Sequence, residues 1–318
     1  MPAQDYEGLT GPDYEVDIER GKIRDFARAM SAPLPDFLEG RRAVVPATFL
    51  VAAPYTFGYT LERPRGTVFQ TIDHDFSVPL HAEESFLFHG PPPRAGDRLI
   101  ARASLEKVVR KSGSSGGDLT FLTMLTTYKS ETGEPVADQR SVTVTTSNSP
   151  GGDDWGADVP DYKPDYPELE PGDLFAGIRR VGWDDLSEGD GPGAVDTGPM
   201  RVGDMVRFQG VVGEDNPLHY DAPWAHDCGY PAVFGLGMHQ ASLLAGYAAH
   251  WIDPATVRSF KARFRNVFWP GERMIHNAVV TRKYRNDAGA PCADLHLTCT
   301  RDNGDSIVDA WMTCRFDG

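Results

Sequence analysis

The sequence predicts an α+β protein built from two copies of one domain, each an antiparallel sheet wrapped around a central helix. Two features predict this class: an internal repeat, and in each half a long uncharged segment followed by alternating strands. A length of 318 residues fits two domains better than one. We expect an N-terminal domain at residues 1–146, a linker at 147–172 and a C-terminal domain at 173–318.

The internal repeat appears at a constant offset of 182 residues. Apolar positions in residues 22–37 coincide with apolar positions in residues 204–219: Ile23 with Met205, Phe26 with Phe208, Met30 with Val212 and Pro35 with Pro217. Residues 86–97 and 260–272 match more loosely. Similarity at a fixed spacing is the signature of a duplicated unit, so the two halves are predicted to share one fold.

The uncharged segments are residues 43–61 and 228–249. Prolines or glycines interrupt both segments, and both carry polar side chains that fit poorly in lipid. We therefore predict helices that are buried on most sides within the protein. Strict alternation over residues 118–128 and 141–146, and over 294–299 and 308–316, predicts a hairpin after each helix.

Pro, Gly and acidic residues crowd the predicted linker and leave it without apolar periodicity. Such a segment cannot form a core of its own.

The overall charge limits the partners that we expect. Lys and Arg number 31 against 46 Asp and Glu, which gives a formal net charge of −15. This field repels nucleic acids and anionic membrane surfaces, so neither is an expected partner. The start of the sequence lacks a targeting pattern, and the four cysteines show no metal-site or CxxC spacing. We expect a reduced, cytoplasmic protein whose cysteines are small core residues.

The densest polar cluster beside an apolar run is Gly-Glu-Asp-Asn-Pro-Leu-His at residues 213–219. A simple acidic turn is one interpretation, since Asn-Pro starts turns. The other interpretation is catalytic, because an uncharged helix that opens with Gly-Leu-Gly-Met at residues 235–238 follows the loop. A carboxylate, an imidazole and a helix N-terminus can add water to a carbonyl-conjugated carbon pair, or remove it, without a metal or organic cofactor.

Residues 208–219, with Gly237, Met238 and the Ala-Ser pair at 241–242, resemble the signature of MaoC-like dehydratases and (R)-specific type-2 enoyl-CoA hydratases. The first half resembles the companion dehydratase domain of that family at residues 45–49, 81–86 and 116–121. The resemblance implies a double hot dog, with two antiparallel sheets each wrapped around a central helix. It also implies a substrate that is an acyl thioester of CoA or acyl carrier protein.

By this resemblance His219 is the catalytic histidine and Asn216 is the signature asparagine. Gly237 is the helix-start donor to the thioester carbonyl, with Met238 beside it in the substrate site. The family pattern Gly-Asp-x-Asn-Pro-x-His has Glu214 here in place of the aspartate. Three interpretations stay open: Glu214 is the acid, Asp215 has taken over as the alternative acid, or the site has been weakened or given another task.

The repeat predicts one active site per chain. At the offset of 182 residues, Ala32 lies opposite Glu214 and Phe37 opposite His219, so the first half lacks both functions. Its expected task is to complete a pseudo-dimer and to shape an acyl tunnel. We also expect a homodimer of the whole chain. A few basic residues on or near predicted strands are candidates for binding CoA phosphates: Arg263, Arg265, Arg282, Lys283 and Arg285.

The predicted function is that of a hydro-lyase of fatty acid metabolism. It would be a (3R)-hydroxyacyl-thioester dehydratase, or trans-2-enoyl-CoA hydratase, that uses Glu214 and His219. Two alternatives remain: a non-catalytic acyl-thioester-binding or partner subunit, and an acyl-CoA thioesterase. The thioesterase is the weaker of these, since neither uncharged segment carries the carboxylate that such enzymes often place on the central helix.

Overall fold

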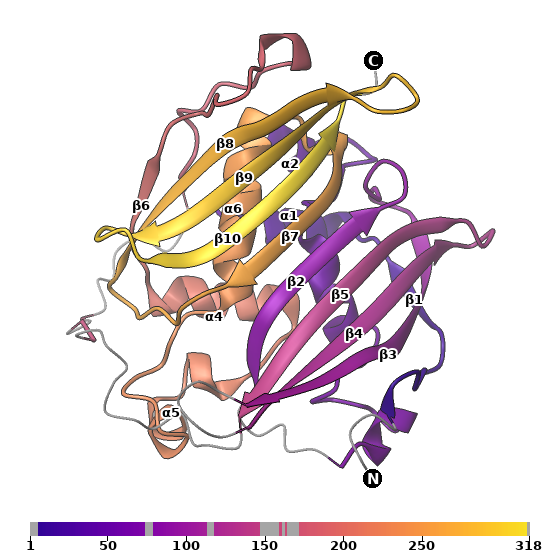
Figure 1. Ribbon diagram of the computed structural model, residues 1–318, viewed down its shortest axis with the longest axis vertical. Coiled ribbons are helices and arrows are strands. Elements are labelled where there is room, and N and C mark those ends of the chain that lie inside the picture. Colours follow the sequence, from indigo (N-terminus) through magenta and orange to yellow (C-terminus); the bar gives the residue numbers. More distant parts are fainter. Residues whose placement is uncertain are drawn as a thin grey trace.

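The computed structural model describes residues 6–73, 79–112, 118–146, 159–160, 163 and 172–316. They form a ten-stranded antiparallel sheet, and the main helices lie behind it in the view of Figure 1. The predicted linker falls outside the described residues except for 159–160, 163 and 172. Its boundaries therefore stay a prediction.

Each half contributes five strands. The first half supplies β1 (Tyr14–Asp17), β2 (Leu80–Phe88), β3 (Arg98–Ser112), β4 (Asp118–Ser130) and β5 (Pro135–Thr146). The second half supplies β6 (Val195–Pro199), β7 (Val257–Phe264), β8 (Arg273–Arg285), β9 (Pro291–Arg301) and β10 (Ser306–Arg315). The predicted hairpins are confirmed, because β4 pairs with β5 and β9 with β10.

The helices follow the same division. The first half has α1 (Arg20–Ala29), α2 (Pro35–Leu38) and α3 (Ala52–Thr56), together with the 3₁₀ turns η2 (Phe49–Val51) and η3 (Val68–Thr71). The second half has α4 (Val202–Val212), α5 (Ala222–Asp227) and α6 (Gly237–Trp251), with the 3₁₀ turns η4 (Trp183–Asp185), η5 (Pro217–His219) and η6 (Pro254–Thr256).

The strand order shows the duplication directly. The sheet runs β1-β3-β4-β5-β2-β7-β10-β9-β8-β6, so the second half repeats the order of the first half in reverse. The halves join where β2 pairs with β7, with Glu84 opposite Ala262 and Phe86 opposite Phe260. The two predicted sheets are therefore one continuous sheet, because the edge strand of each half finds its backbone partners in the other half.

The repeat in the helices is confirmed at the predicted offset. α1 begins at Arg20 and α4 at Val202, which are 182 residues apart, and the two helices pack against each other. The rings of Phe26 and Phe208 meet edge to face, with centroids 5.6 Å apart, and both rings are fully buried. Equivalent apolar side chains from the two copies thus form the core between the halves.

The two central helices are unequal, which corrects the expectation of a full helix in each half. In the second half α6 is buried along almost its whole length, whereas residues 43–61 form only η2 and the five-residue α3. A longer helix through this segment would need a backbone donor at Pro54, which has none, so Pro54 is held within the first turn of α3. No helix in the described ranges is both long and apolar enough to cross a membrane.

The central helix region of one half packs tightly on that of the other. The hydroxyls of Thr48 and Ser242, both buried, lie 2.9 Å apart and form a hydrogen bond. A side chain at Gly246 would meet the Ala32 methyl at 2.8 Å, so only glycine allows the close approach of α6. The four cysteines are free thiols. Cys292, Cys299 and Cys314 are buried, as expected of core residues, whereas Cys228 is only partly buried.

His276 makes the folded state sensitive to acid. This side chain on β8 is fully buried, and neither ring nitrogen has a hydrogen-bond partner among the described residues. Burial, reinforced by nearby His239, lowers the pKa of His276 from 6.5 to about 3. As the pH falls below 6.5, His276 binds a proton in the unfolded chain but stays neutral in the folded protein. The free energy of unfolding therefore decreases from pH 6.5 down to about pH 3.

We expect His276→Leu to weaken this pH dependence. Between pH 6.5 and pH 3 its unfolding free energy should fall less steeply than that of the native protein, by about 1.4 kcal/mol per pH unit. Urea denaturation at a series of pH values measures this slope. The control is His226→Gln, since His226 is exposed in the folded protein and should leave the slope unchanged. Parallel curves for His276→Leu and the native protein would show that His276 is not the cause.

Candidate active site

A tight turn after α4 sets the geometry of residues 213–219, which we call the catalytic loop after its predicted role. Gly213 ends the helix with φ at +83°, a left-handed conformation that glycine adopts without strain, and its N–H donates to the Gln209 carbonyl at 2.7 Å. Asn216 then caps η5, because its Oδ1 accepts from the Leu218 N–H at 3.1 Å. The chain reverses within a few residues, which brings the side chains of Glu214 and His219 to one place.

Hydrogen bonds hold both carboxylate oxygens of Glu214. Oε1 accepts from the backbone N–H of Asn216 at 2.8 Å, and Oε2 accepts from Gln209 Nε2 at 3.0 Å. The same Gln209 nitrogen donates to the Asn216 carbonyl at 3.0 Å. The longer side chain of glutamate is therefore anchored to the loop rather than left to move. Asn216 thus holds Glu214 and Gln209 through its backbone groups, while its side chain caps η5.

The ring of His219 is oriented by one hydrogen bond. Its Nδ1 lies 2.8 Å from the Phe234 carbonyl, which can only accept, so Nδ1 carries the proton and Nε2 of the neutral ring is an acceptor. Burial lowers the pKa of His219 below 6.5, and the nearby Glu214 charge opposes this effect. The imidazole is thus neutral at physiological pH and its Nε2 can accept a proton, as a general base requires.

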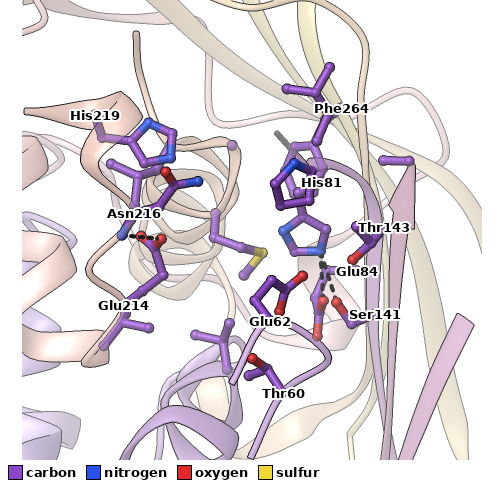
Figure 2. A pocket seen from close by; sticks show the side chains of 18 of the residues that line it. Thr60, Glu62, His81, Glu84, Ser141, Thr143, Glu214, Asn216, His219 and Phe264 are labelled. Atoms are coloured by element: carbon purple, nitrogen blue, oxygen red, sulfur yellow. Dashed lines mark hydrogen bonds and ion pairs between the residues drawn. The ribbon is translucent and has the colours of Figure 1, made fainter. Parts of the chain in front are cut away.

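Glu214 and His219 line a cavity of about 980 Å³ that both halves of the chain enclose. Its walls include the catalytic loop, the start of α6, the end of β7 and residues of α3, β2, β4 and β5. Figure 2 shows Glu214, Asn216 and His219 on one side, with His81, Glu84, Ser141 and Thr143 on the other. The first half therefore contributes to the cavity, as the sequence predicted.

Gly237 and Met238 line the same cavity at the N-terminus of α6. The helix begins at Gly237 and not at Gly235, whose N–H donates to the Phe268 carbonyl at 2.8 Å. In the described part of the chain, the Gly237 N–H has no acceptor, so it is available to a carbonyl oxygen of a substrate. A Cβ at Gly237 would lie 2.6 Å from the Phe264 ring, so only glycine fits.

Asp215 is directed toward solvent and Arg63. Its side chain is 75% exposed and forms an ion pair with Arg63, which also donates to the Gly213 carbonyl at 3.2 Å. Both candidate acids line the cavity, but only Glu214 has both of its oxygens held by hydrogen bonds from Gln209 and Asn216, and its charge acts on His219. This geometry favours Glu214 over Asp215.

The candidate CoA-binding basic residues are widely spread. Arg265 lines the cavity and pairs with Asp309 at 2.7 Å. Arg263 pairs with Glu83 at 3.0 Å, outside the cavity lining. Arg282, Lys283 and Arg285 do not line the cavity and pack their cationic groups on the rings of Tyr284 or Trp183. Two further arginines, Arg63 and Arg301, line the cavity and were not among the candidates.

A second polar cluster in the cavity is formed by His81 and Glu84 on β2 and Ser141 on β5, and no sequence pattern predicts it as a site. Residues 81–86 carry only a resemblance to the companion dehydratase domain. Regular strand alternation places His81 and Glu84 on opposite faces of β2, so no local signal marks them as neighbours.

Comparisons with known proteins agree with this architecture. A MaoC-like domain model matches residues 186–290, and a model of a FAS1-like dehydratase domain region matches residues 9–139. The chain belongs to the MaoC-like dehydratase family. A relative named UPF0336 protein, from Streptomyces griseus subsp. griseus, is 32% identical over 111 residues, which are 34% of this chain and 72% of that protein.

Members of the MaoC-like family have been solved with the same fold. A structure named MaoC-like dehydratase superposes with a TM-score of 0.75 at 24% identity, over 99% of this chain and all of that one. A conserved hypothetical protein from Mycobacterium tuberculosis, described as having a double hotdog fold, gives 0.60 at 14% identity, over 98% of this chain and 96% of its own. The predicted double hot dog is confirmed.

The coupling between Glu214 and His219 can be measured directly. In Glu214→Gln the charge that raises the pKa of His219 is removed, so we expect the imidazole to titrate at a lower pH than in the native protein. NMR titration of the His219 ring measures this shift. Asp215→Asn is the matched control, because Asp215 pairs with Arg63 and should leave the His219 titration unchanged. An unchanged titration in Glu214→Gln would show that the two groups do not interact.

Proposed function

We propose that the protein hydrates trans-2-enoyl thioesters reversibly, and equally dehydrates (3R)-3-hydroxyacyl thioesters. One observation carries this proposal: the Glu214 carboxylate, the basic His219 and the Gly237 N–H all open onto one cavity. These are the groups that such a reaction needs, because it moves protons and develops negative charge on a carbonyl oxygen. Membership of the MaoC-like family supports the same reaction.

In the hydration direction, a water molecule sits between Glu214 and His219 and gives up a proton to this pair of side chains as its oxygen attacks the β-carbon. The thioester oxygen gains negative charge, which the Gly237 N–H and the positive end of the α6 dipole stabilise. The enolate then takes a proton at the α-carbon, so that one water has been added across the double bond. Delivery of both groups from one wall gives syn addition.

The substrate is proposed to be an acyl-CoA or an acyl carrier protein thioester. The volume of the cavity, about 980 Å³, accommodates an acyl chain with part of its thioester arm. Two partly exposed arginines of its lining, Arg63 and Arg265, can donate hydrogen bonds to an anionic carrier, although each also pairs with an aspartate and the net charge is −15. The proposed chemistry uses protein side chains and water, so it needs no added cofactor.

The direct test is incubation with crotonyl-CoA and longer trans-2-enoyl-CoAs while the absorbance of the conjugated thioester is followed. Loss of absorbance, with (3R)-3-hydroxyacyl-CoA as product, is the expected result. Tight acyl-CoA binding without turnover, unaffected by His219→Ala, would instead indicate a non-catalytic binding subunit. Release of free CoA would indicate a thioesterase.

Substitution of the two acidic residues separates their roles. Glu214→Gln keeps the side-chain size but removes the charge and the proton acceptor, so we expect kcat to fall by roughly 10² to 10⁴. Asp215→Asn should change kcat by less than about threefold, since Asp215 faces solvent and Arg63. Steady-state kinetics on one enoyl-CoA measures both. A large loss in Asp215→Asn with little loss in Glu214→Gln would assign the acid to Asp215.

A further inference from the structure

The wall opposite the catalytic loop carries a partly buried hydrogen-bonding cluster that the proposed reaction does not use. His81, Glu84 and Ser141 line the cavity from β2 and β5, facing Glu214 and His219 in Figure 2. We call these three residues the distal cluster. A purely apolar acyl chain would gain nothing from such a wall and would leave its polar groups without water or a partner.

A β-bulge builds the distal cluster. His81 pairs with Thr143 and Glu84 pairs with Ser141, so three steps along β2 match two steps along β5. One extra residue in β2 turns His81 and Glu84, which would otherwise point to opposite faces, toward the same cavity. Bulges that redirect side chains are frequent beside functional sites.

The buried carboxylate of Glu84 is fixed in place. Its side chain is 1% exposed, and Oε1 accepts from Gln139 Nε2 at 2.7 Å. Tyr128 donates to Gln139 Oε1 at 2.6 Å, which fixes the orientation of that amide. Burial raises the pKa of Tyr128 well above 10, so its hydroxyl remains a donor. A chain of hydrogen bonds thus holds Glu84 from behind.

Glu84 in turn orients His81. Glu84 Oε2 lies 2.8 Å from His81 Nε2, and Ser141 Oγ lies 3.3 Å from the same nitrogen. With the Nε2 proton directed at these two oxygens, Nδ1 of the neutral ring is an acceptor, and in the described residues it has no partner. Because Ser141 accepts from His81, its own proton stays free to donate. The cluster therefore offers one acceptor and one donor.

The distal cluster lies near the helix start that would hold the thioester, because His81 and Gly237 pack on the same phenylalanine, Phe264. The ring of His81 packs on the ring of Phe264, with centroids 4.7 Å apart. Phe264 also packs against the α-carbon of Gly237, where a side chain would otherwise lie. Tyr55 also lines the cavity, and burial together with the carboxylates of Glu62, Glu214 and Glu84 raises the pKa of its hydroxyl well above 10. A thioester held at Gly237 would thus extend its acyl chain past His81.

The charges of the cavity decide which polar group fits. Glu62, Glu84 and Glu214 line it, whereas each arginine of the lining has an acidic partner: Arg63 with Asp215, Arg265 with Asp309 and Arg301 with Glu272. A carboxylate on the acyl chain would meet this negative field, but an uncharged hydroxyl would not.

Resting on the proposed function, we propose that the acyl chain of the substrate carries a hydroxyl group, which the distal cluster binds. The hydroxyl donates to His81 Nδ1 and accepts from Ser141 Oγ. The site so defined recognises hydroxylated acyl thioesters and discriminates against alkyl and carboxylated ones.

Binding can be measured without turnover. Saturated acyl-CoAs of a chain-length series, each made with a terminal methyl, hydroxyl or carboxylate group, are titrated into the native protein in a calorimeter. At one chain length the hydroxyl compound should bind roughly ten- to a hundredfold more tightly than the methyl compound of equal length, and the carboxylate compound should bind most weakly. His81→Leu and Ser141→Ala should each bring the hydroxyl-to-methyl ratio close to one.

Ser85→Ala is the matched control for Ser141→Ala. Ser85 lies on β2 next to Glu84 but does not line the cavity, so its removal should keep the hydroxyl preference. Should His81→Leu fail to fold, Ser141→Ala alone decides the question. Equal affinities for the methyl and hydroxyl compounds at every length, or a preference that survives both substitutions, would overturn this inference. Hydration of enoyl-CoAs, assayed separately, reports on the proposed function whatever the binding result.

Discussion

The pairing of β2 with β7 is the interaction on which the rest of the molecule depends. These edge strands join the two halves into one sheet, from Glu83 opposite Arg263 to Leu87 opposite Ser259. Without this pairing each half would expose a row of unpaired backbone groups. The same seam brings Phe264, at the end of β7, between His81 on β2 and Gly237 on α6. The cavity that holds the candidate site forms where this pairing brings the two halves together.

Duplication followed by divergence explains why the two halves differ at their common interface. The loop after α4 carries Glu214 and His219, whereas the equivalent positions after α1 are Ala32 and Phe37, both fully buried in the core. Ala32 packs on Gly246 and Phe37 lies in the core, so at these positions the first copy has packing side chains where the second has a carboxylate and an imidazole. It contributes instead through its sheet, where a bulge in β2 turns His81 and Glu84 into the cavity.

The electrostatics of the site follow from burial and local pairing more than from net charge. The carboxylates of Glu84 and Glu214 each accept two hydrogen bonds, which offset the loss of hydration. His219 is kept neutral by burial, while Glu214 moderates that effect. Each arginine that lines the cavity is paired with an aspartate or a glutamate, so its positive charge is largely balanced within the cavity lining or beside it.

Local patterns in the sequence determined the class of fold, the duplication, the hairpins and the loop that holds Glu214 and His219. These follow from periodicity and turn chemistry over a few residues, which the chain carries wherever it folds. The sequence also predicted a helix that opens within residues 235–238, and α6 begins at Gly237.

Other features were decided only by tertiary structure. Both Glu214 and Asp215 suit the role of acid by composition, and it is the long-range partner Arg63 that draws Asp215 away. The first central helix was predicted too long, because the apolar composition of residues 43–61 outweighed the constraint at Pro54. The bulge that sets His81 beside Glu84 breaks the period of two that strand prediction assumes, and it exists only because β2 is paired with β5. Sequence alone fixes what neighbours along the chain can do, whereas pairing between distant segments decides which side chains meet.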